Sequence, residues 1–434
     1  MKNVKLFLLT GILVFTISCS HQQKQPQQGF VKVTDGQFMI NDEPYYFVGT
    51  NYWYGPLLAA PEGGDRQRLK TELDFLEEKG VNNLRILIGA QGPYSMAYRV
   101  SPALQKTPED YDEDLLKGLD YLMAELAKRK MYAVLYFANN WIWSGGMAQY
   151  LNWNGYGEIP NPFLEQYSWP QYMNYVTQFH SCEPCKEDLR QHIRFIMQRT
   201  NSVTGQKYVD DPAIMSWQVS NEPRVLAEHN KKHFENWLHN TVDLIDSLDP
   251  NHLVSTGSEG RVATLEDIEL YKDLHSYPKI DYLTMHIWPY NWGWHRKEQE
   301  AQTVDSSIIK AKKYFDQHLD VARELQKPIV LSEFGFPRDG FTTDPDAPVT
   351  YRNRFYKEIF KMIAQNASEK GVFAGLNFWG FGGNAEVDPE NPMWEFGDDF
   401  TGDPPQEPQG WNSVFMSDTS TFKMIERYNN KLQQ

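Results

Sequence analysis

The strongest constraint on the fold of this chain is a set of eight short apolar runs that alternate with helical patterns. The runs are continuous rather than alternating in polarity, which is typical of parallel strands buried on both faces. The predicted strands span residues 45–51, 83–88, 132–138, 214–219, 252–257, 282–287, 328–333 and 373–379.

Apolar residues at helical spacing fill the stretches between these runs. Leu69, Leu73 and Leu76 form one such series. Eight strands, each with a helix after it, predict a (β/α)8 TIM barrel of the α/β class. The segments 142–180 and 380–412 are expected to be long loops at the C-terminal face of the strands. A doubly wound open sheet is the alternative.

The first 35 residues predict export. Two lysines precede an apolar run that is short for a membrane span, so residues 1–18 are expected to be a signal peptide. Cys19 follows directly, as at a bacterial lipoprotein cleavage site, and the Gln-rich residues 19–35 suit a lipid-anchored flexible tether. We therefore expect a secreted protein, or an outer-membrane or cell-surface lipoprotein of a bacterium. A single barrel domain is expected over residues 36–434.

Charge and aromatic content narrow the class of partner. The formal net charge is -15 and the chain has no Lys/Arg-rich run, which argues against nucleic acid and anionic membrane surfaces. Many of the 13 tryptophans lie in loop-like segments such as NYWYGP and NNWIWSGG. Indole rings in loops are suited to stack on flat apolar ligand faces, which sugar rings present. We expect a monomer whose only link to a membrane is the anchor at Cys19.

Cys182 and Cys185 form the motif CxxC. An oxidising compartment favours a local disulfide between them. A zinc site would need a second pair of ligands, and the sequence has none at ligand spacing.

Polar and aromatic residues stand where most of the predicted strands end. In a barrel these positions converge on the C-terminal rim, which carries active sites. They are Asn51, Trp53, Arg85, Asn139, Asn140, Trp141, Asn221, Glu222, Ser258, Glu259, His286, Glu333 and Trp379. The sequence therefore predicts carboxylates, a guanidinium, an imidazole and indoles around one cleft.

Glu222 follows the fourth strand and Glu333 ends the seventh, so the two face each other across the mouth of the barrel. Such a pair suits glycoside hydrolysis, in which one carboxyl donates a proton and the other attacks the anomeric carbon. A guanidinium from Arg85 near Glu333 would keep Glu333 ionised and leave the proton on Glu222. Asn221 is placed to hydrogen-bond a sugar hydroxyl. Glu259 is a rival for either acid.

The segments NEP and LSEFG, after the fourth strand and at the seventh, resemble glycoside hydrolase family 5. DPAIMSWQVSNEPR and DPPQEPQGWNSVF narrow this resemblance to the endo-β-1,4-mannanase branch, and it covers nearly everything from about residue 36 onward. The resemblance implies a retaining hydrolase that works by double displacement. It implies no metal and no organic cofactor, because the two carboxylates suffice.

The resemblance also assigns roles to individual residues. Glu222 matches the acid/base and Glu333 the nucleophile. The substrate-binding residues that it implies are Arg85, Asn140, Trp141, Asn221, His286 and Trp379. Trp53 and Trp288 join this set from their places on the rim. Trp288 stands where the family usually has a tyrosine, and Trp143 stands where polar residues are common.

The sequence thus predicts an endo-β-1,4-mannanase that cleaves internal linkages of mannan, glucomannan or galactomannan. The same barrel and acids would suit an exo-acting β-mannosidase, if the long loops close one end of the cleft. They would also suit a cellulase-like β-1,4-glucanase. A catalytically silent glycan-binding barrel is the alternative of another class, and loss of either acid would have favoured it.

Overall fold

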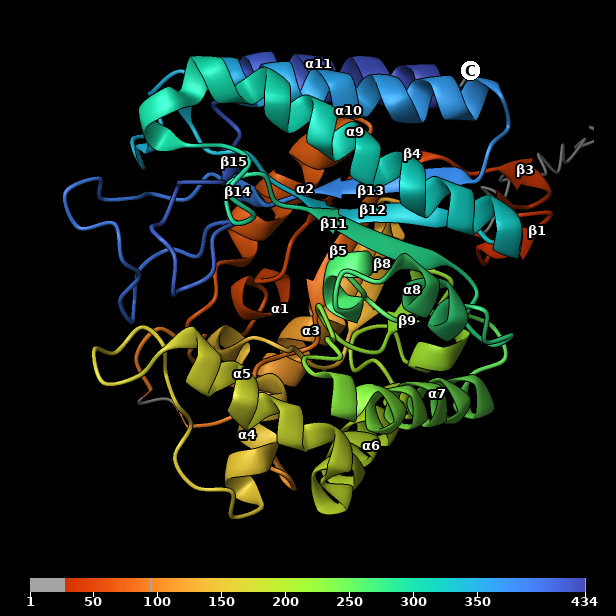
Figure 1. Ribbon diagram of the computed structural model, residues 1–434, viewed down its shortest axis with the longest axis vertical. Coiled ribbons are helices and arrows are strands. Elements are labelled where there is room, and N and C mark those ends of the chain that lie inside the picture. Colours follow the sequence, from red (N-terminus) through yellow and green to blue (C-terminus); the bar gives the residue numbers. More distant parts are fainter. Residues whose placement is uncertain (1–27, 94–95, 434) are drawn as a thin grey trace, which may run out of the picture.

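The computed structural model of the protein describes residues 28–93 and 96–433 (Figure 1). The strands lie at the centre and helices surround them (Figure 1). The predicted signal peptide at residues 1–18 and the predicted anchor at Cys19 lie outside the described residues. Within the described ranges, no helix has both the length and the apolar character that crossing a membrane requires.

Eight parallel strands form the barrel, and each was predicted from its apolar run. They are β4 (Phe47–Asn51), β5 (Asn83–Leu87), β8 (Tyr132–Tyr136), β9 (Ile214–Gln218), β10 (Leu253–Ser255), β11 (Leu283–Ile287), β12 (Ile329–Phe334) and β13 (Phe373–Phe378). Their order is β10-β9-β8-β5-β4-β13-β12-β11. Every residue in them is buried, because one face of each strand fills the barrel and the other packs against helices.

The barrel closes between β10 and β11. The backbone N–H of Asp281 donates to the carbonyl of Val254 at 2.9 Å, and that of His286 donates to the carbonyl of Glu259 at 3.0 Å. The second bond joins two strand ends that the sequence placed on the rim.

Helices pack around the barrel, with α9, α10 and α11 together on one side and α6 and α7 on the opposite side (Figure 1). The longer ones are α2 (Arg66–Glu78), α3 (Glu113–Lys128), α6 (Glu183–Met197), α7 (Lys231–Leu248), α9 (Glu300–Leu325), α10 (Thr350–Ser368) and α11 (Thr419–Leu432). The shorter ones are α1 (Gly55–Leu58), α4 (Gly146–Trp153), α5 (Trp169–Thr177) and α8 (Ile268–His275). The predicted series Leu69, Leu73 and Leu76 forms the buried face of α2.

The last helix supports the first barrel strand. Strand β4 pairs with β5 at Thr50 and Asn51, near its end. Earlier in the strand, Val48 donates its N–H to Asn429 Oδ1 at 3.0 Å and accepts from Asn429 Nδ2 at 3.1 Å. The buried amide of Asn429 on α11 therefore takes the place of a neighbouring strand.

Three short strands close the N-terminal end of the barrel. They are β1 (Lys32–Thr34), β2 (Gln37–Ile40) and β3 (Glu43–Pro44). The predicted tether over residues 19–35 is thus wrong for its last residues, because β1 pairs antiparallel with β2. Val31 packs in an apolar cluster with Tyr132 and Leu253 of the barrel. This cluster seals one end, so polar groups gather at the other.

The chain after β13 folds over the mouth of the barrel. Its short strands are β14 (Phe381–Gly383) and β15 (Val414–Phe415). Between them, we call residues 400–412 the wall segment. The carboxylate of Asp403 holds it together by accepting from the backbone and hydroxyl of Ser413. Arg68 of α2 donates to the Phe400 carbonyl at 2.8 Å and so ties the wall segment to the barrel.

Cys182 and Cys185 form a disulfide at the start of α6, as their spacing predicted. Both are buried, so this bond fixes the entry into the helix and is shielded from solvent.

Candidate active site

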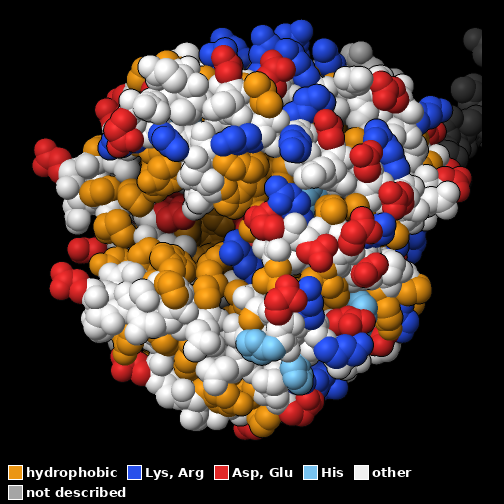
Figure 2. All heavy atoms as spheres, viewed as in Figure 1, with side chains coloured by type: hydrophobic (Ala, Val, Ile, Leu, Met, Phe, Trp, Pro, Cys, Tyr) orange, Lys and Arg blue, Asp and Glu red, His pale blue; other side chains and the backbone are white. Residues whose placement is uncertain are grey.

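A cavity of about 680 Å³ opens at the C-terminal ends of the strands. Figure 2 shows a hollow on this face, with hydrophobic side chains gathered around it. Both acids predicted from the sequence, Glu222 and Glu333, line the cavity. So do five of the predicted or noted aromatic and amide residues, which are Trp141, Trp143, Asn221, Trp288 and Trp379.

The backbone after β9 places Glu222 in the cavity. Asn221 N–H donates to the Ala138 carbonyl at 2.7 Å, and Glu222 N–H donates to the Gly257 carbonyl at 3.0 Å. Glu222 has a φ of 48°, in the left-handed region that side chains other than glycine rarely adopt. Neighbouring strands on both sides therefore hold this residue in a strained turn that aims its carboxyl inward.

Trp141 and His286 both contact the Glu222 carboxyl. The indole Nε1–H of Trp141 donates to Oε2, and His286 Nδ1 lies 2.6 Å from Oε1. The other nitrogen of His286 lies 3.0 Å from Ser332 Oγ. Burial, and then the charge of Arg85, hold the pKa of His286 well below its usual range. The imidazole is therefore neutral and has one proton to share between Glu222 and Ser332.

The Glu333 carboxylate is bound by Arg85, which reaches it from β5. The same guanidinium donates to Asn221 Oδ1 at 2.8 Å and to Gln218 Oε1 at 2.7 Å. It also lies over the ring of Tyr136, 4.5 Å from its centre. These contacts hold the Arg85 guanidinium in place, so it supplies a fixed positive charge beside Glu333.

The two acids lie close together at the centre of the site. The nearest carboxyl oxygens of Glu222 and Glu333 lie within 4.8 Å of each other and of His286. Burial raises the pKa of both carboxyls, and the Arg85 cation opposes this rise at Glu333. Two carboxylates at this range repel, which favours a pair that shares one proton over a pair with two charges. Arg85 binds Glu333 directly, so its cation favours the charge on Glu333 and the proton on Glu222.

The same three groups are also close enough to hold a metal ion, as two carboxylates and an imidazole can. The sequence predicted that none is needed, and a cation there would compete with the proton that the pair shares.

Glu259, the rival acid, has a different environment. Its two oxygens accept from Arg224 at 2.5 and 2.7 Å in a bidentate pair. Arg224 follows the NEP motif and lies over the indole of Trp141, 4.7 Å from its centre. The Glu259 carboxylate is therefore committed to an ion pair that braces Trp141, and it is not free for proton transfer.

One end of the cavity is enclosed by aromatic residues and by the wall segment. Trp379 and Trp143 are only 4% and 2% exposed, and both line the cavity. Trp288 meets Trp379 edge-on with ring centres 5.8 Å apart. Glu407 of the wall segment also lines the cavity, and burial raises its pKa to about 8. Buried indoles and the Glu407 carboxyl therefore lie together on this side of the cavity.

Two residues predicted to bind substrate lie elsewhere. Trp53 is 1% exposed and donates to the Gly402 carbonyl at 3.0 Å, so it supports the wall segment from behind. Asn140 is fully buried, and its backbone N–H donates to the Asn221 carbonyl at 2.9 Å. Arg85 and His286 likewise touch the acids from beneath rather than line the cavity.

The sequence reasoning missed several cavity residues on loops. They include Phe163, Trp169, Met173, Arg224, Gln406, Glu407 and Trp411. The local signals for them were the position of Arg224 directly after NEP, the motif DPPQEPQGWNSVF, which contains Gln406, Glu407 and Trp411, and the aromatic content of the long loops.

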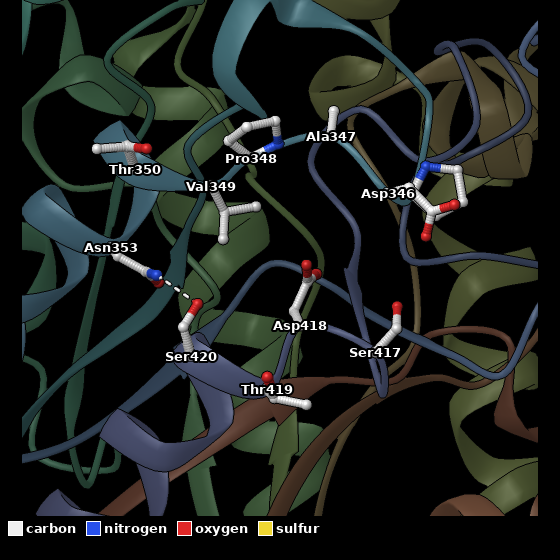
Figure 3. A pocket seen from close by; sticks show the side chains of 11 residues that line it. Asp346, Ala347, Pro348, Val349, Thr350, Asn353, Ser417, Asp418, Thr419 and Ser420 are labelled. Carbon is white, nitrogen blue, oxygen red and sulfur yellow. Dashed lines mark hydrogen bonds between the residues drawn. The ribbon is translucent and has the colours of Figure 1, made fainter.

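A second hollow of about 580 Å³ lies where α10 and α11 begin (Figure 3). Asn353 donates to Ser420 Oγ across it at 2.8 Å (Figure 3). The buried carboxylate of Asp418 there is bound by Arg338 at 2.7 Å. Because Asp418 is held in this ion pair, we place the active site at the strand ends and not in this second hollow.

Comparison with known proteins gives matches over almost the whole chain. Residues 28–434 match the family described as GH family 5 beta-mannosidase-like. Mannan endo-1,4-beta-mannosidase 1 of Solanum lycopersicum is 30% identical over 370 residues, which are 82% of this chain and 84% of that protein. A family 5 mannosidase from Rhizomucor miehei has a TM-score of 0.86 at 33% identity, over 93% of this chain and 98% of that chain.

A second enzyme from the same fungus, an endo-1,4-beta-mannanase, has a TM-score of 0.67 at 20% identity. The match covers 93% of this chain and 99% of that chain, and it shows the shared fold.

The prediction of a secreted or surface lipoprotein of a bacterium is wrong. The curated relatives are plant mannanases, from Solanum lycopersicum, Arabidopsis thaliana and Oryza sativa, and they point to a eukaryotic origin.

Proposed function

This chain belongs to glycoside hydrolase family 5, and on that basis we propose that it hydrolyses β-1,4-mannosidic linkages with retention of configuration. The observation that carries the proposal is the pair formed by Glu222 and Glu333. Their nearest oxygens are within 4.8 Å, which supports the carboxyl separation of about 5–5.5 Å in retaining enzymes over the about 6.5–9.5 Å that admits a water in inverting enzymes. The pair is thus spaced for direct attack on the sugar.

The first step of the proposed reaction forms a covalent intermediate. Glu333, ionised beside Arg85, attacks the anomeric carbon while Glu222 gives its proton to the departing glycosidic oxygen. Asn221 accepts from Arg85 through Oδ1 and donates one amide hydrogen to Asn139 at 3.2 Å. Its second amide hydrogen is left to bind the sugar 2-hydroxyl, a contact that strengthens in the transition state.

The second step releases the sugar. Glu222, now ionised, takes a proton from water, the water attacks the anomeric carbon, and Glu333 leaves as a carboxylate. Glu222 must therefore lose and regain its proton in every cycle. The neutral His286 beside it can follow this change by exchanging its donor nitrogen between Glu222 and Ser332.

The shape of the cavity favours cleavage at a chain end. Trp379 is the expected floor under the reacting sugar, yet it is only 4% exposed, and its ring packs against those of Trp143 and Trp288. A polymer that passed through an open groove would need room beyond this floor. We therefore favour removal of terminal mannose units, which agrees with the similarity to the Rhizomucor miehei mannosidase.

Internal cleavage, as predicted from the sequence, is the second candidate. It is supported by the plant relatives, which are named mannan endo-1,4-beta-mannosidases. Incubation with mannopentaose and with galactomannan, followed by chromatography of the products, separates the two modes. Terminal action gives mannose from the start, whereas internal cleavage gives longer fragments first and lowers the viscosity of galactomannan.

The same assay tests the substrate and the class of protein. Release of sugar from carboxymethyl-cellulose but not from mannan would contradict the β-mannoside assignment. Binding of mannan without any turnover would support a silent glycan-binding barrel. Proton NMR of the first product reports whether the configuration at the anomeric carbon is retained.

A further inference from the structure

We propose that Trp169 is a sugar-binding platform on the leaving-group side of the cavity, over which the rest of the mannan chain extends. This inference rests on the proposed function, since it names where the part of the substrate beyond the cleaved bond is held. Trp169 lies in the predicted long loop after the third strand.

The position of Trp169 is fixed by its helix. It is the first residue of α5, directly after Ser168 and before Pro170, which is well suited to the first turn of a helix. Trp169 lines the cavity, yet it is 40% exposed, unlike the covered Trp379 and Trp143. It is therefore a large apolar surface at the open end of the cavity.

Neighbouring rings hold the Trp169 indole by their edges or meet it at right angles. Trp141 lies 5.6 Å away at an interplanar angle of 87°, Phe163 lies 5.5 Å away at 83°, and Tyr172 lies 5.9 Å away at 90°. Tyr172 is in turn tied to the Asn140 carbonyl at 2.7 Å. An indole that is held on three sides and still 40% exposed is prepared to stack on a ligand without losing further side-chain freedom.

The contact with Trp141 shows which part of the substrate Trp169 would meet. Trp141 donates to Glu222, and Glu222 protonates the oxygen of the leaving sugar in the proposed reaction. The leaving sugar therefore lies on the side of Trp141, away from the enclosed end at Trp379. Because Trp169 is one indole further out, it meets a sugar beyond the one that is directly attached to the cleaved bond.

Phe195 provides a matched control. It is also 40% exposed and also stacks on a neighbouring ring, with its centre 4.0 Å from that of Tyr111. It lies on the outer helix α6 and does not line the cavity. Exposed aromatic residues alone are common, so the comparison isolates the effect of position.

The experiment compares Trp169→Ala, Trp169→Phe and Phe195→Ala on two substrates. Mannotetraose reaches beyond the cleaved bond, whereas 4-nitrophenyl β-mannoside has a single sugar. We expect Trp169→Ala to lower kcat/KM for mannotetraose about tenfold, mostly through KM, because stacking area is lost. Trp169→Phe should lie between Trp169→Ala and the wild type. The nitrophenyl substrate should change less than about twofold, and Phe195→Ala should leave both substrates unchanged.

An equal loss on both substrates would assign Trp169 a merely structural role, and no loss on mannotetraose would also overturn the inference. If the wild type turned over neither substrate, the proposed function would fail, and calorimetry with mannotetraose would then decide about Trp169. Weaker binding by Trp169→Ala than by Phe195→Ala would still support the platform, and equal binding would reject it.

Discussion

His286 and Glu222 lie 2.6 Å apart, Nδ1 to Oε1, on strand ends that are two places apart in the chain order of the barrel. The imidazole is neutral, so it either accepts a proton from Glu222 or donates one to it. One side chain thus serves Glu222 in both of its protonation states, as an acid and base in turn requires.

Replacing either acid by glutamine should separate their roles. On mannotetraose, Glu222→Gln should lose about 10²–10⁴-fold in kcat, the usual contribution of a proton-transfer group. With 2,4-dinitrophenyl β-mannoside, whose leaving group needs no proton, Glu222→Gln should still release a rapid burst of phenolate. Glu333→Gln should give no burst, because it cannot form the covalent intermediate.

Glu259→Gln is the control for these two variants. Both oxygens of Glu259 are held by Arg224, so its loss should reduce kcat far less than loss of either acid. A larger effect of Glu259→Gln than of Glu333→Gln would mean that the wrong carboxylate has been assigned as nucleophile.

Removing the charge of Arg85 should move the pH profile of kcat/KM upward. The Arg85 cation lowers the pKa of Glu333 and, more weakly, that of Glu222, against the effect of burial. In Arg85→Met both carboxyls should therefore titrate at higher pH, with the acid limb shifted by about 1–3 units. Arg85→Lys keeps a cation and should shift less. A profile that falls in height without moving would show that Arg85 acts only on geometry.

Loosening the wall segment should change where chains are cut. Arg68 donates to the Phe400 carbonyl at 2.8 Å and pairs with the buried Glu72 at 2.7 Å. Arg68→Lys retains the charge beside Glu72 and loses the forked contact with the wall segment. We expect a higher ratio of mannobiose to mannose from mannopentaose, measured by chromatography at low conversion.

Asp399→Asn is the control for the wall. Asp399 is the outer partner of Arg68, at 3.3 Å, and its side chain is 42% exposed. Exposed ion pairs contribute little, so the product ratio should stay that of the wild type. The same shift of the product ratio in both variants would show that surface charge, rather than the wall segment, determines where chains are cut.

His192 should make the protein less stable in acid. It is fully buried between Tyr111 and Phe137, and burial lowers its pKa from 6.5 to about 3. Between these pH values the unfolded chain binds a proton that the folded chain does not, so unfolding becomes easier as pH falls. His192→Gln should flatten the slope of unfolding free energy against pH by about 1.4 kcal/mol per unit.

Urea unfolding at several pH values between 6 and 4 measures this slope. An unchanged slope in His192→Gln would mean that His192 is protonated to the same extent in both states.

The strands could be predicted because barrel strands are buried on both faces, and burial leaves a local mark in the sequence. Glu222 and Glu333 could be placed for the same reason, since each ends such a run. The position of Trp53 could not be predicted in this way. Like Trp141, it follows a barrel strand, but its indole lies beneath residues 400–412, which come about 350 positions later in the chain.

Local sequence patterns also could not predict which residues line the open side of the cavity. Trp169 begins a short helix within the long segment after the third strand, and Glu407 lies on the loop after β14. No periodicity of such segments reports which side of a cavity they will form. The sequence showed that those loops contain an unusual number of aromatic residues, but it did not show where each of them lies in the fold.

The bond between Asn429 and Val48 sets the order in which this protein can be finished. Residue 48 is synthesised early, whereas the amide that binds its backbone comes 381 residues later. The first strand must wait for the last helix, and the wall of the cavity is made only shortly before it. A chain that stops before α11 lacks the side chain that bonds the Val48 backbone, so truncation of this helix should weaken the first barrel strand.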